Sequence, residues 1–163
     1  MSTRTETPTA RPAVDGVKGA RILIVESRYY ADIADALIAG AEREIAKNGA
    51  TSERVVVPGA FEIPGAIALA AAKEGTRYDG FVALGCVIRG ETTHYDYVCG
   101  ESARALQDLA VRHGLALGYG ILTVENDDQA WTRARMTEKD KGGGAAEAVL
   151  AMLAIRKKLG LSA

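Results

Sequence analysis

Short runs of β-branched residues alternate with longer amphipathic segments along this chain, and the alternation restricts its fold more than any other feature. The apolar runs predict buried strands at residues 21–25, 54–57, 80–88 and 117–124. The other periodic segments predict helices at residues 32–48, 62–75, 96–112, 127–136 and 143–159. Gly49, Gly75, Gly114 and Gly160 are the expected helix stops. Strands that alternate with helices favour a parallel sheet covered on both faces, and such sheets bind ligands beyond the carboxyl ends of their strands.

Length and charge narrow the class of protein. A chain of 163 residues can bury the core of one domain without further staples. Its 20 Lys and Arg residues nearly balance 21 Asp and Glu residues, so we expect neither nucleic acid nor an anionic membrane as a partner. Residues 1–19 carry charges and prolines without an apolar run, which predicts a flexible tail rather than a secretory signal. Residues 20–163 are expected to form a single domain.

The two cysteines, Cys86 and Cys99, lack the spacing of a disulfide framework or a zinc site. We therefore expect two reduced thiols in a cytoplasmic protein. The sequence has no P-loop, no His/Cys cluster for a metal, no nucleophile elbow and no apolar stretch long enough to span a bilayer. Residues 118–123 match a dinucleotide fingerprint only in part, and they lie inside a predicted strand rather than after one.

Aromatic residues gather where the predicted strands end. They make up only 6% of the chain, yet Tyr29, Tyr30, Phe61 and Tyr95 all lie at strand-to-helix junctions. Polar loops would explain the charges at these junctions, but not the exposed rings beside glycines. Flat apolar surfaces with a few polar groups are suited to binding a planar heterocycle.

The junction after the third predicted strand is the richest in chemical groups. Arg89 is followed by Gly90, Thr92 and Thr93, and the helix N-terminus predicted here would offer amides and hydroxyls to a phosphate-sized anion. His94 follows at once; a histidine ordinarily has a pKa near 6.5 and can exchange a proton near neutral pH. A capping or loop histidine is an equal alternative from the residues alone. His113, at a predicted helix C-terminus, is interpreted as structural.

Further along the chain, Arg133 and the run from Lys139 to Gly144 offer other contacts to an anion. A solvated charged turn is the preferred interpretation for Lys139. The spacing does not decide between the two interpretations for Arg133 and Lys141.

Four long segments resemble, in order and in spacing, the signatures of the lumazine synthase family. They are VPGAFEIP (57–64), LGCVIRGETTHYDYVC (84–99), GILTVENDDQAWTRA (120–134) and DKGGGAAEA (140–148), and the similarity covers residues 21–160. The resemblance implies an α/β protein with a flavodoxin-like three-layer α/β/α sandwich and a four-stranded parallel sheet. It also implies a transferase that condenses 5-amino-6-(D-ribitylamino)uracil with 3,4-dihydroxy-2-butanone 4-phosphate, the penultimate step of riboflavin biosynthesis. Members of the family use no metal and no organic cofactor.

The resemblance also implies a role for individual residues. In the family pattern the position of His94 transfers protons, and that of Tyr29 stacks on the pyrimidine. The other matching positions contact the ring and ribityl chain (Ala60, Phe61, Glu62), the uracil through the main chain (Cys86, Val87, Ile88), the butanone phosphate (Glu91, Thr92, Arg133, Lys141) and the heterocycle from an adjacent subunit (Tyr119). This sequence departs from the pattern at Tyr29, where Phe or Trp is common, and at Asp140, where Asn is common. The second change brings a negative charge next to Lys141.

The family resemblance further implies a homopentamer, alone or in larger assemblies of pentamers, and raises association with riboflavin synthase as an open question. Three alternatives remain at this point. One is a lumazine- or flavin-binding relative without catalysis, against which His94, Arg133 and Lys141 argue. Another is a signalling domain, which would need an aspartate where Gly85 and Cys86 stand. The third is a specialised isoenzyme, which sequence does not separate from the housekeeping enzyme.

Overall fold

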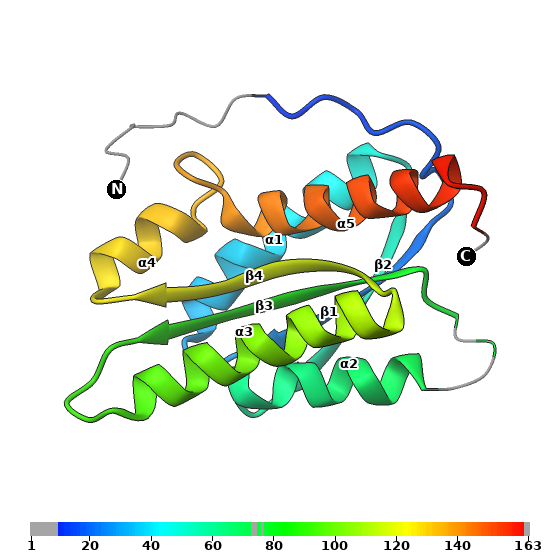
Figure 1. Cartoon of the computed structure of the whole chain (residues 1–163). Helices are drawn as coiled ribbons and strands as arrows, with labels where there is room; N and C mark the ends of the chain where they lie inside the picture. Colours follow the sequence, from blue (N-terminus) through cyan, green and yellow to red (C-terminus); the bar gives the residue numbers. More distant parts are fainter. Residues whose placement is uncertain (1–9, 73–74, 76, 162–163) are drawn as a thin grey trace.

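A computed structural model describes residues 10–72, 75 and 77–161 of the chain (Figure 1). Within these residues four strands form one sheet: β1 (Arg21–Ser27), β2 (Thr51–Val57), β3 (Gly80–Ile88) and β4 (Ala116–Val124). The strand order is β2-β1-β3-β4, and each neighbouring pair is parallel. The carboxyl ends of the described strands therefore meet at one edge of the sheet.

The described helices cover both faces of the sheet. Figure 1 shows α1 (Ala31–Lys47), α4 (Asp127–Ala134) and α5 (Lys141–Lys158) on one side, and α2 (Ile63–Ala71) with α3 (His94–His113) on the other. A short 3-10 turn, η1 (Ala60–Glu62), leads into α2. The prediction of a flavodoxin-like three-layer α/β/α sandwich with a four-stranded parallel sheet is confirmed.

Alternation of side chains along the strands divides the core into two clusters. On β1, Ile22 and Ile24 pack with the apolar faces of α1 and α5, whereas Leu23 and Val25 pack with residues of α2 and α3. All four are almost fully buried. A strand buried on both faces is uniformly apolar, which explains the RILIV run of the sequence.

Helix ends agree with the sequence prediction where glycine can adopt a left-handed backbone. Gly49 and Gly114 have φ values of 71° and 63°. Gly114 directly follows α3, and Gly49 follows α1 after Asn48. The prediction was wrong at the end of α2, which stops at Ala71, four residues before Gly75. It also placed the start of α3 at Asp96, whereas the helix begins at His94 and Asp96 lies in its first turn. An acidic residue is favourable anywhere in the first turn of a helix, so its position does not define the first residue.

The predicted tail lies partly outside the described residues, because the structure describes it only from residue 10 onward. The described part runs beside α1 and α5 (Figure 1). Val17 is buried in the core, the Val14 amide donates to Asn48 Oδ1 at 2.7 Å, and the Arg11 guanidinium contacts α5. The tail and its boundary stay a prediction.

Glycines allow α1 and α5 to approach each other closely. A Cβ placed on Gly142 would lie 2.0 Å from the Leu37 carbonyl oxygen, a distance that side chains do not adopt. The backbones of the two helices therefore pack directly against each other, and the first turn of α5 is fixed on α1.

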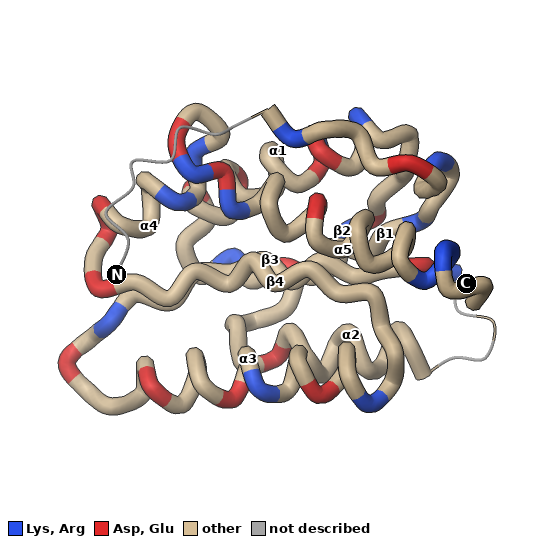
Figure 2. The backbone as a smooth tube through the Cα atoms, turned by 45° about the horizontal axis from the view of Figure 1, so that its top comes forward, with Lys and Arg blue, Asp and Glu red and all other residues tan. Residues whose placement is uncertain are grey.

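None of the described helices is both long and apolar enough to cross a bilayer. Lys and Arg positions are interspersed with Asp and Glu positions along the backbone (Figure 2).

Candidate active site

A cleft of about 590 Å³ opens at the carboxyl edge of the sheet. It lies between the ends of β1 and β3, the turn η1 and the start of α3, which come together because β1 and β3 are neighbours in the sheet. Its lining includes nine of the predicted site residues, namely Tyr29, Ala60, Phe61, Glu62, Cys86, Val87, Ile88, Thr92 and His94. Predicted positions from three separate segments of the sequence thus share one cavity.

Exposed aromatic rings line the cleft, among them Tyr29 and Phe61. The side chain of Tyr29 is 76% exposed and that of Phe61 is 55% exposed. The Tyr29 ring meets the half-buried Tyr30 ring edge-to-face, with centroids 5.0 Å apart, and Tyr30 is anchored on the hydrophobic core. The local fold therefore holds a flat apolar surface in solvent at the point where strand β1 ends, as a planar ligand requires.

The floor of the cleft is apolar and neutral. Ala60 and Cys86 are buried, and Val87 and Ile88 are partly buried at the end of β3. Burial raises the pKa of the Cys86 thiol to about 12, with Asp127 and Cys99 as further contributions in the same direction. Cys86 is therefore a protonated thiol at neutral pH rather than a nucleophile.

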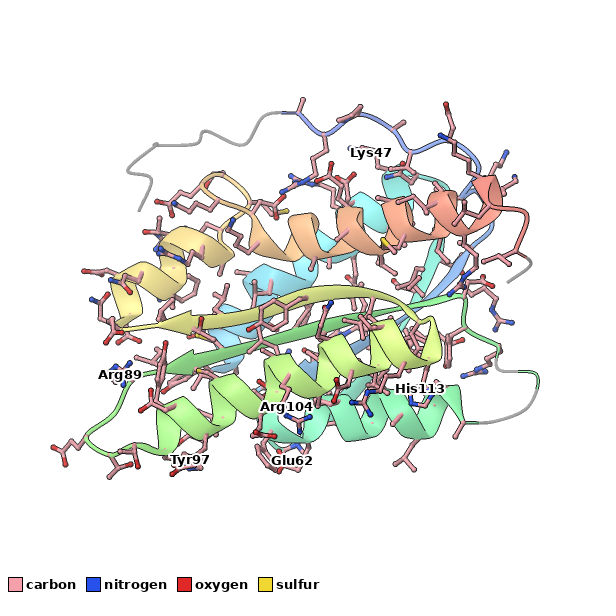
Figure 3. All side chains as sticks on the ribbon, in the orientation of Figure 1. Lys47, Glu62, Arg89, Tyr97, Arg104 and His113 are labelled. Atoms are coloured by element: carbon pink, nitrogen blue, oxygen red, sulfur yellow. The ribbon has the colours of Figure 1, made fainter. Side chains whose placement is uncertain are left out.

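His94 is the first residue of α3, and its side chain is exposed at the cleft. Its backbone amide faces Thr92 Oγ1 at 3.4 Å. Tyr97 and Val98 also line the cleft, although the sequence prediction did not include them. They follow His94 by three and four residues, so a helix that starts at His94 brings all three to one face. Figure 3 shows Tyr97 near this end of α3 and His113 at the opposite end.

Arg89 connects the loop before His94 to the end of the neighbouring strand β4. Its backbone amide donates to the Val124 carbonyl at 2.9 Å, and its guanidinium pairs with Glu125 at 2.8 Å and with Asp96 at 3.4 Å. The guanidinium also lies 4.1 Å from the centre of the Tyr95 ring. Figure 3 shows Arg89 at the tip of β3. The sequence suggested Arg89 as a cation beside an anion site, but here its charge is shared by two carboxylates.

The remaining four predicted site residues do not line this cleft. Glu91 lies in the exposed loop before α3, and Tyr119 stands half-exposed on the edge strand β4. Arg133 lies in the last turn of α4 and donates to the Gln129 carbonyl at 3.0 Å, and Lys141 is the first residue of α5. Helices α4 and α5 cover the face of the sheet opposite to α3 (Figure 1).

The described lining of the cleft consequently has aromatic rings and an imidazole but no ammonium or guanidinium group. Among the described residues that line it, none is Lys or Arg. Arg28, the residue after β1, pairs with Asp35 at 2.7 Å and with Glu26 at 3.2 Å. The described part of the chain also contains no group of three His, Cys, Asp or Glu side chains placed to hold a metal ion. An anionic substrate would need cations from outside this cleft.

Comparison with known proteins identifies one family whose members match nearly the whole chain. The model of the family described as 6,7-dimethyl-8-ribityllumazine synthase matches residues 19–157. The chain is 60% identical over 147 residues to 6,7-dimethyl-8-ribityllumazine synthase 1 of Rhizobium meliloti (strain 1021), which covers 88% of this chain and 96% of that protein. It is 60% identical over 142 residues to 6,7-dimethyl-8-ribityllumazine synthase of Agrobacterium fabrum, covering 85% and 96%. For the protein of the same name from Methylorubrum populi, the identity is 54% over 164 residues, covering 99% and 97%. The chain therefore belongs to the 6,7-dimethyl-8-ribityllumazine synthase family.

Proposed function

We propose that this protein condenses 5-amino-6-(D-ribitylamino)uracil with 3,4-dihydroxy-2-butanone 4-phosphate to give 6,7-dimethyl-8-ribityllumazine, the penultimate step of riboflavin biosynthesis. Membership of the family supports the reaction. The observation that carries the assignment to this site is the convergence of Tyr29, Phe61 and His94 on one cleft at the carboxyl edge of the sheet. Residues of the same types spread over the surface would not have supported it.

The pyrimidine is assigned to the cleft described above. Its flat ring would stack on the Tyr29 ring, and Phe61 and Glu62 would contact the ring and the ribityl chain. Main-chain groups of Cys86, Val87 and Ile88 are suited to the uracil edge because the end of β3 forms the floor. A neutral Cys86 thiol leaves the floor uncharged, which favours a neutral heterocycle over an anion.

The reaction then needs several proton transfers. The 5-amino group attacks the butanone carbonyl to form an imine with loss of water. Phosphate is then eliminated to leave an enol, which tautomerises to a new carbonyl. The ribityl-bearing nitrogen attacks this carbonyl, and loss of a second water closes the ring. We assign the proton transfers to His94, the histidine that lines the cleft. Orientation of two small molecules can by itself remove roughly 7–11 kcal/mol of barrier in ideal cases. We therefore expect the geometry of the cleft to contribute more than His94 does.

The phosphate of the second substrate is assigned to Arg133 and Lys141, with Glu91 and Thr92 beside it. Because the described lining of the cleft includes no Lys or Arg, these two cations would come from an adjoining protomer, together with the ring of Tyr119. The exposed rings of Tyr29 and Phe61 would then be covered in the assembly rather than left in water. We propose a homopentamer as the smallest active unit.

Mixing of the purified protein with both substrates tests the reaction directly. Growth of the lumazine chromophore at a rate above that of the protein-free mixture is expected. A protein that binds lumazine but gives no such increase would be a binding relative, and the proposed function would be wrong. Light scattering at the assay concentration should give five times the mass of the chain, and a monomer would contradict the shared site.

Subunit mixing tests whether the site is shared. The variants His94→Ala and Arg133→Ala remove residues that we assign to opposite sides of an interface. Oligomers assembled from both variants should regain part of the activity, because some sites then combine an intact His94 with an intact Arg133. Absence of any gain over the separate variants would indicate that both residues act within one protomer.

We also infer a cytoplasmic location from the two unpaired thiols, Cys86 and Cys99.

A further inference from the structure

Asp140, the residue before Lys141, is buried in an unusual conformation. It is fully buried and has φ 44° and ψ 56°, the only positive φ of a described residue other than glycine. Its Oδ1 accepts a hydrogen bond from the Gly143 amide at 3.1 Å and so caps α5. Aspartate and asparagine tolerate the left-handed region better than most residues, so the conformation fits either residue.

Two arginines from distant segments hold the other carboxylate oxygen. Asp140 Oδ2 lies 2.6 Å from Arg11 Nη1 and 2.7 Å from Arg43 Nη2. Arg11 also donates to the Asp140 carbonyl at 2.9 Å and pairs with Glu147 at 3.0 Å. Arg11 comes from the N-terminal segment and Arg43 from α1, so both fix the start of α5 from outside that helix.

The carboxylate occupies a slot that glycines create. A Cβ on Gly40 of α1 or on Gly143 of α5 would collide with the Asp140 carboxylate oxygens. The side chain is thereby confined between the two helices and points away from solvent. Both Arg11 and Arg43 neutralise the buried Asp140 carboxylate, and Arg11 also pairs with the partly exposed Glu147.

Lys141 is left with its charge available. It is exposed, and within the described residues its ammonium has no ion-pair partner. A carboxylate on the preceding residue would compete with phosphate for this ammonium if it could turn outward, since opposite charges on adjacent side chains come within a few ångströms. The two arginines remove that competition.

We propose that Arg11 and Arg43 are positioning residues for the phosphate site: they hold the Asp140 carboxylate between α1 and α5 and so keep the Lys141 ammonium free for the substrate phosphate. This inference depends on the proposed function, which assigns Lys141 to the phosphate. It also explains how this chain accommodates aspartate where the family commonly has asparagine, a residue without a charge to neutralise.

Steady-state kinetics of three variants test the proposal. In Arg11→Ala/Arg43→Ala the freed carboxylate is expected to pair with Lys141 and to raise KM for the butanone phosphate about tenfold, with little change for the pyrimidine. Addition of Asp140→Asn to this variant should restore KM to within about twofold of the original value, because the amide keeps the helix cap and carries no charge. Asp140→Asn alone should bind phosphate normally. Arg11→Ala alone, which keeps Arg43, should show a smaller rise of roughly threefold and serves if the double variant does not fold.

Arg156→Ala is the matched control. Arg156 also joins distant segments, since it donates to the carbonyls of Gly114 and Asp79, but it does so at the opposite edge of the sheet. It should lower thermal stability without changing either KM. The proposal is overturned if the arginine variants lose stability with unchanged KM, if both KM values rise together, or if Asp140→Asn fails to restore phosphate binding.

Calorimetric titration with inorganic phosphate separates this proposal from the proposed function. If the unmodified protein forms no lumazine, the proposed function is wrong. Phosphate binding that weakens in Arg11→Ala/Arg43→Ala and returns on addition of Asp140→Asn would support the positioning role even then. Equal phosphate affinity in all of these variants would contradict it.

Discussion

Substitution of Gly142 by Ala should separate α1 from α5 and destabilise the protein by about 3 kcal/mol. The added Cβ would lie 2.0 Å from the Leu37 carbonyl oxygen and 2.7 Å from its carbon, so the obstacle is backbone that no rotamer change removes. Ordinary contact begins at 3.4 Å, and the helices would have to move apart locally by up to 1.4 Å, the difference between the two distances. A radial gap of about 0.5–1 Å already loses a quarter to a half of the dispersion energy of a contact. Since Leu37, Ala145 and Ala146 are almost fully buried at this junction, we place the cost at the upper end of the usual range for overpacking.

Gly144→Ala is the matched control in the same turn. The nearest atom to its Cβ would be Arg11 Nη2 at 3.5 Å, which is an ordinary contact. Without a collision, replacement of a helical glycine by alanine should stabilise the protein by up to about 1 kcal/mol.

Scanning calorimetry at one fixed protein concentration measures both effects, because assembly makes Tm depend on concentration. A domain of this size changes Tm by about 2–4 °C per kcal/mol, so Gly142→Ala should lower Tm by about 6–12 °C and Gly144→Ala should raise it slightly. Equal Tm values for the two variants would refute the argument that backbone contact limits this junction.

Three further predictions concern the site itself. His94→Ala should slow turnover by about 10- to 100-fold without abolishing it, because orientation is retained, and should alter the pH–rate profile; an unchanged rate and profile would exclude His94 as the proton carrier. Arg133→Ala should raise KM for the butanone phosphate by about tenfold and leave KM for the pyrimidine nearly unchanged, and a selective effect on the pyrimidine would contradict the assignment. The Cys86 thiol has its pKa raised by burial to about 12, so peptide mapping should find it unmodified after iodoacetamide treatment of the native protein at pH 8. The folded state keeps this proton where the unfolded state loses it, so its contribution to stability is present below pH 9 and declines as the pH rises toward 12.

The sequence predicted best those elements that need only an apolar environment and no particular neighbouring residue. Strand β3 has the predicted bounds because an apolar run buried on both faces does not depend on any particular neighbour. Strand β1 continues two residues beyond the prediction, through Glu26 and Ser27. Glu26 can be fully buried in the strand because Arg28 and Arg54 neutralise its charge. Arg54 lies on β2, so this ion pair is a tertiary contact that the sequence around Glu26 does not indicate. Strand β2 begins three residues before its predicted start at Arg54, since polar residues are tolerated on an edge strand.

In the candidate site, too, some positions could be predicted from the order of the elements and others could not. Positions at the carboxyl ends of β1 and β3 could be foreseen because strand order brings them to one edge. Tyr97 and Val98 were missed because the predicted helix began two residues too late, which hid their common face with His94. Whether Tyr119, Arg133 and Lys141 belong to the same site is not decided by the order of elements within one chain. Their assignment depends on how two copies would meet.

The central place of β1 in the sheet has a consequence for synthesis of the protein. Strand β1 is made early, but it acquires its second neighbour, β3, only after about fifty further residues have left the ribosome, and His94 follows later still. Pairings between segments so distant in the chain are slow to form. A nascent chain would therefore display the Tyr29 ring well before it could hold a pyrimidine. During refolding, pyrimidine binding should therefore appear when β1 pairs with β3, which is later than helix formation.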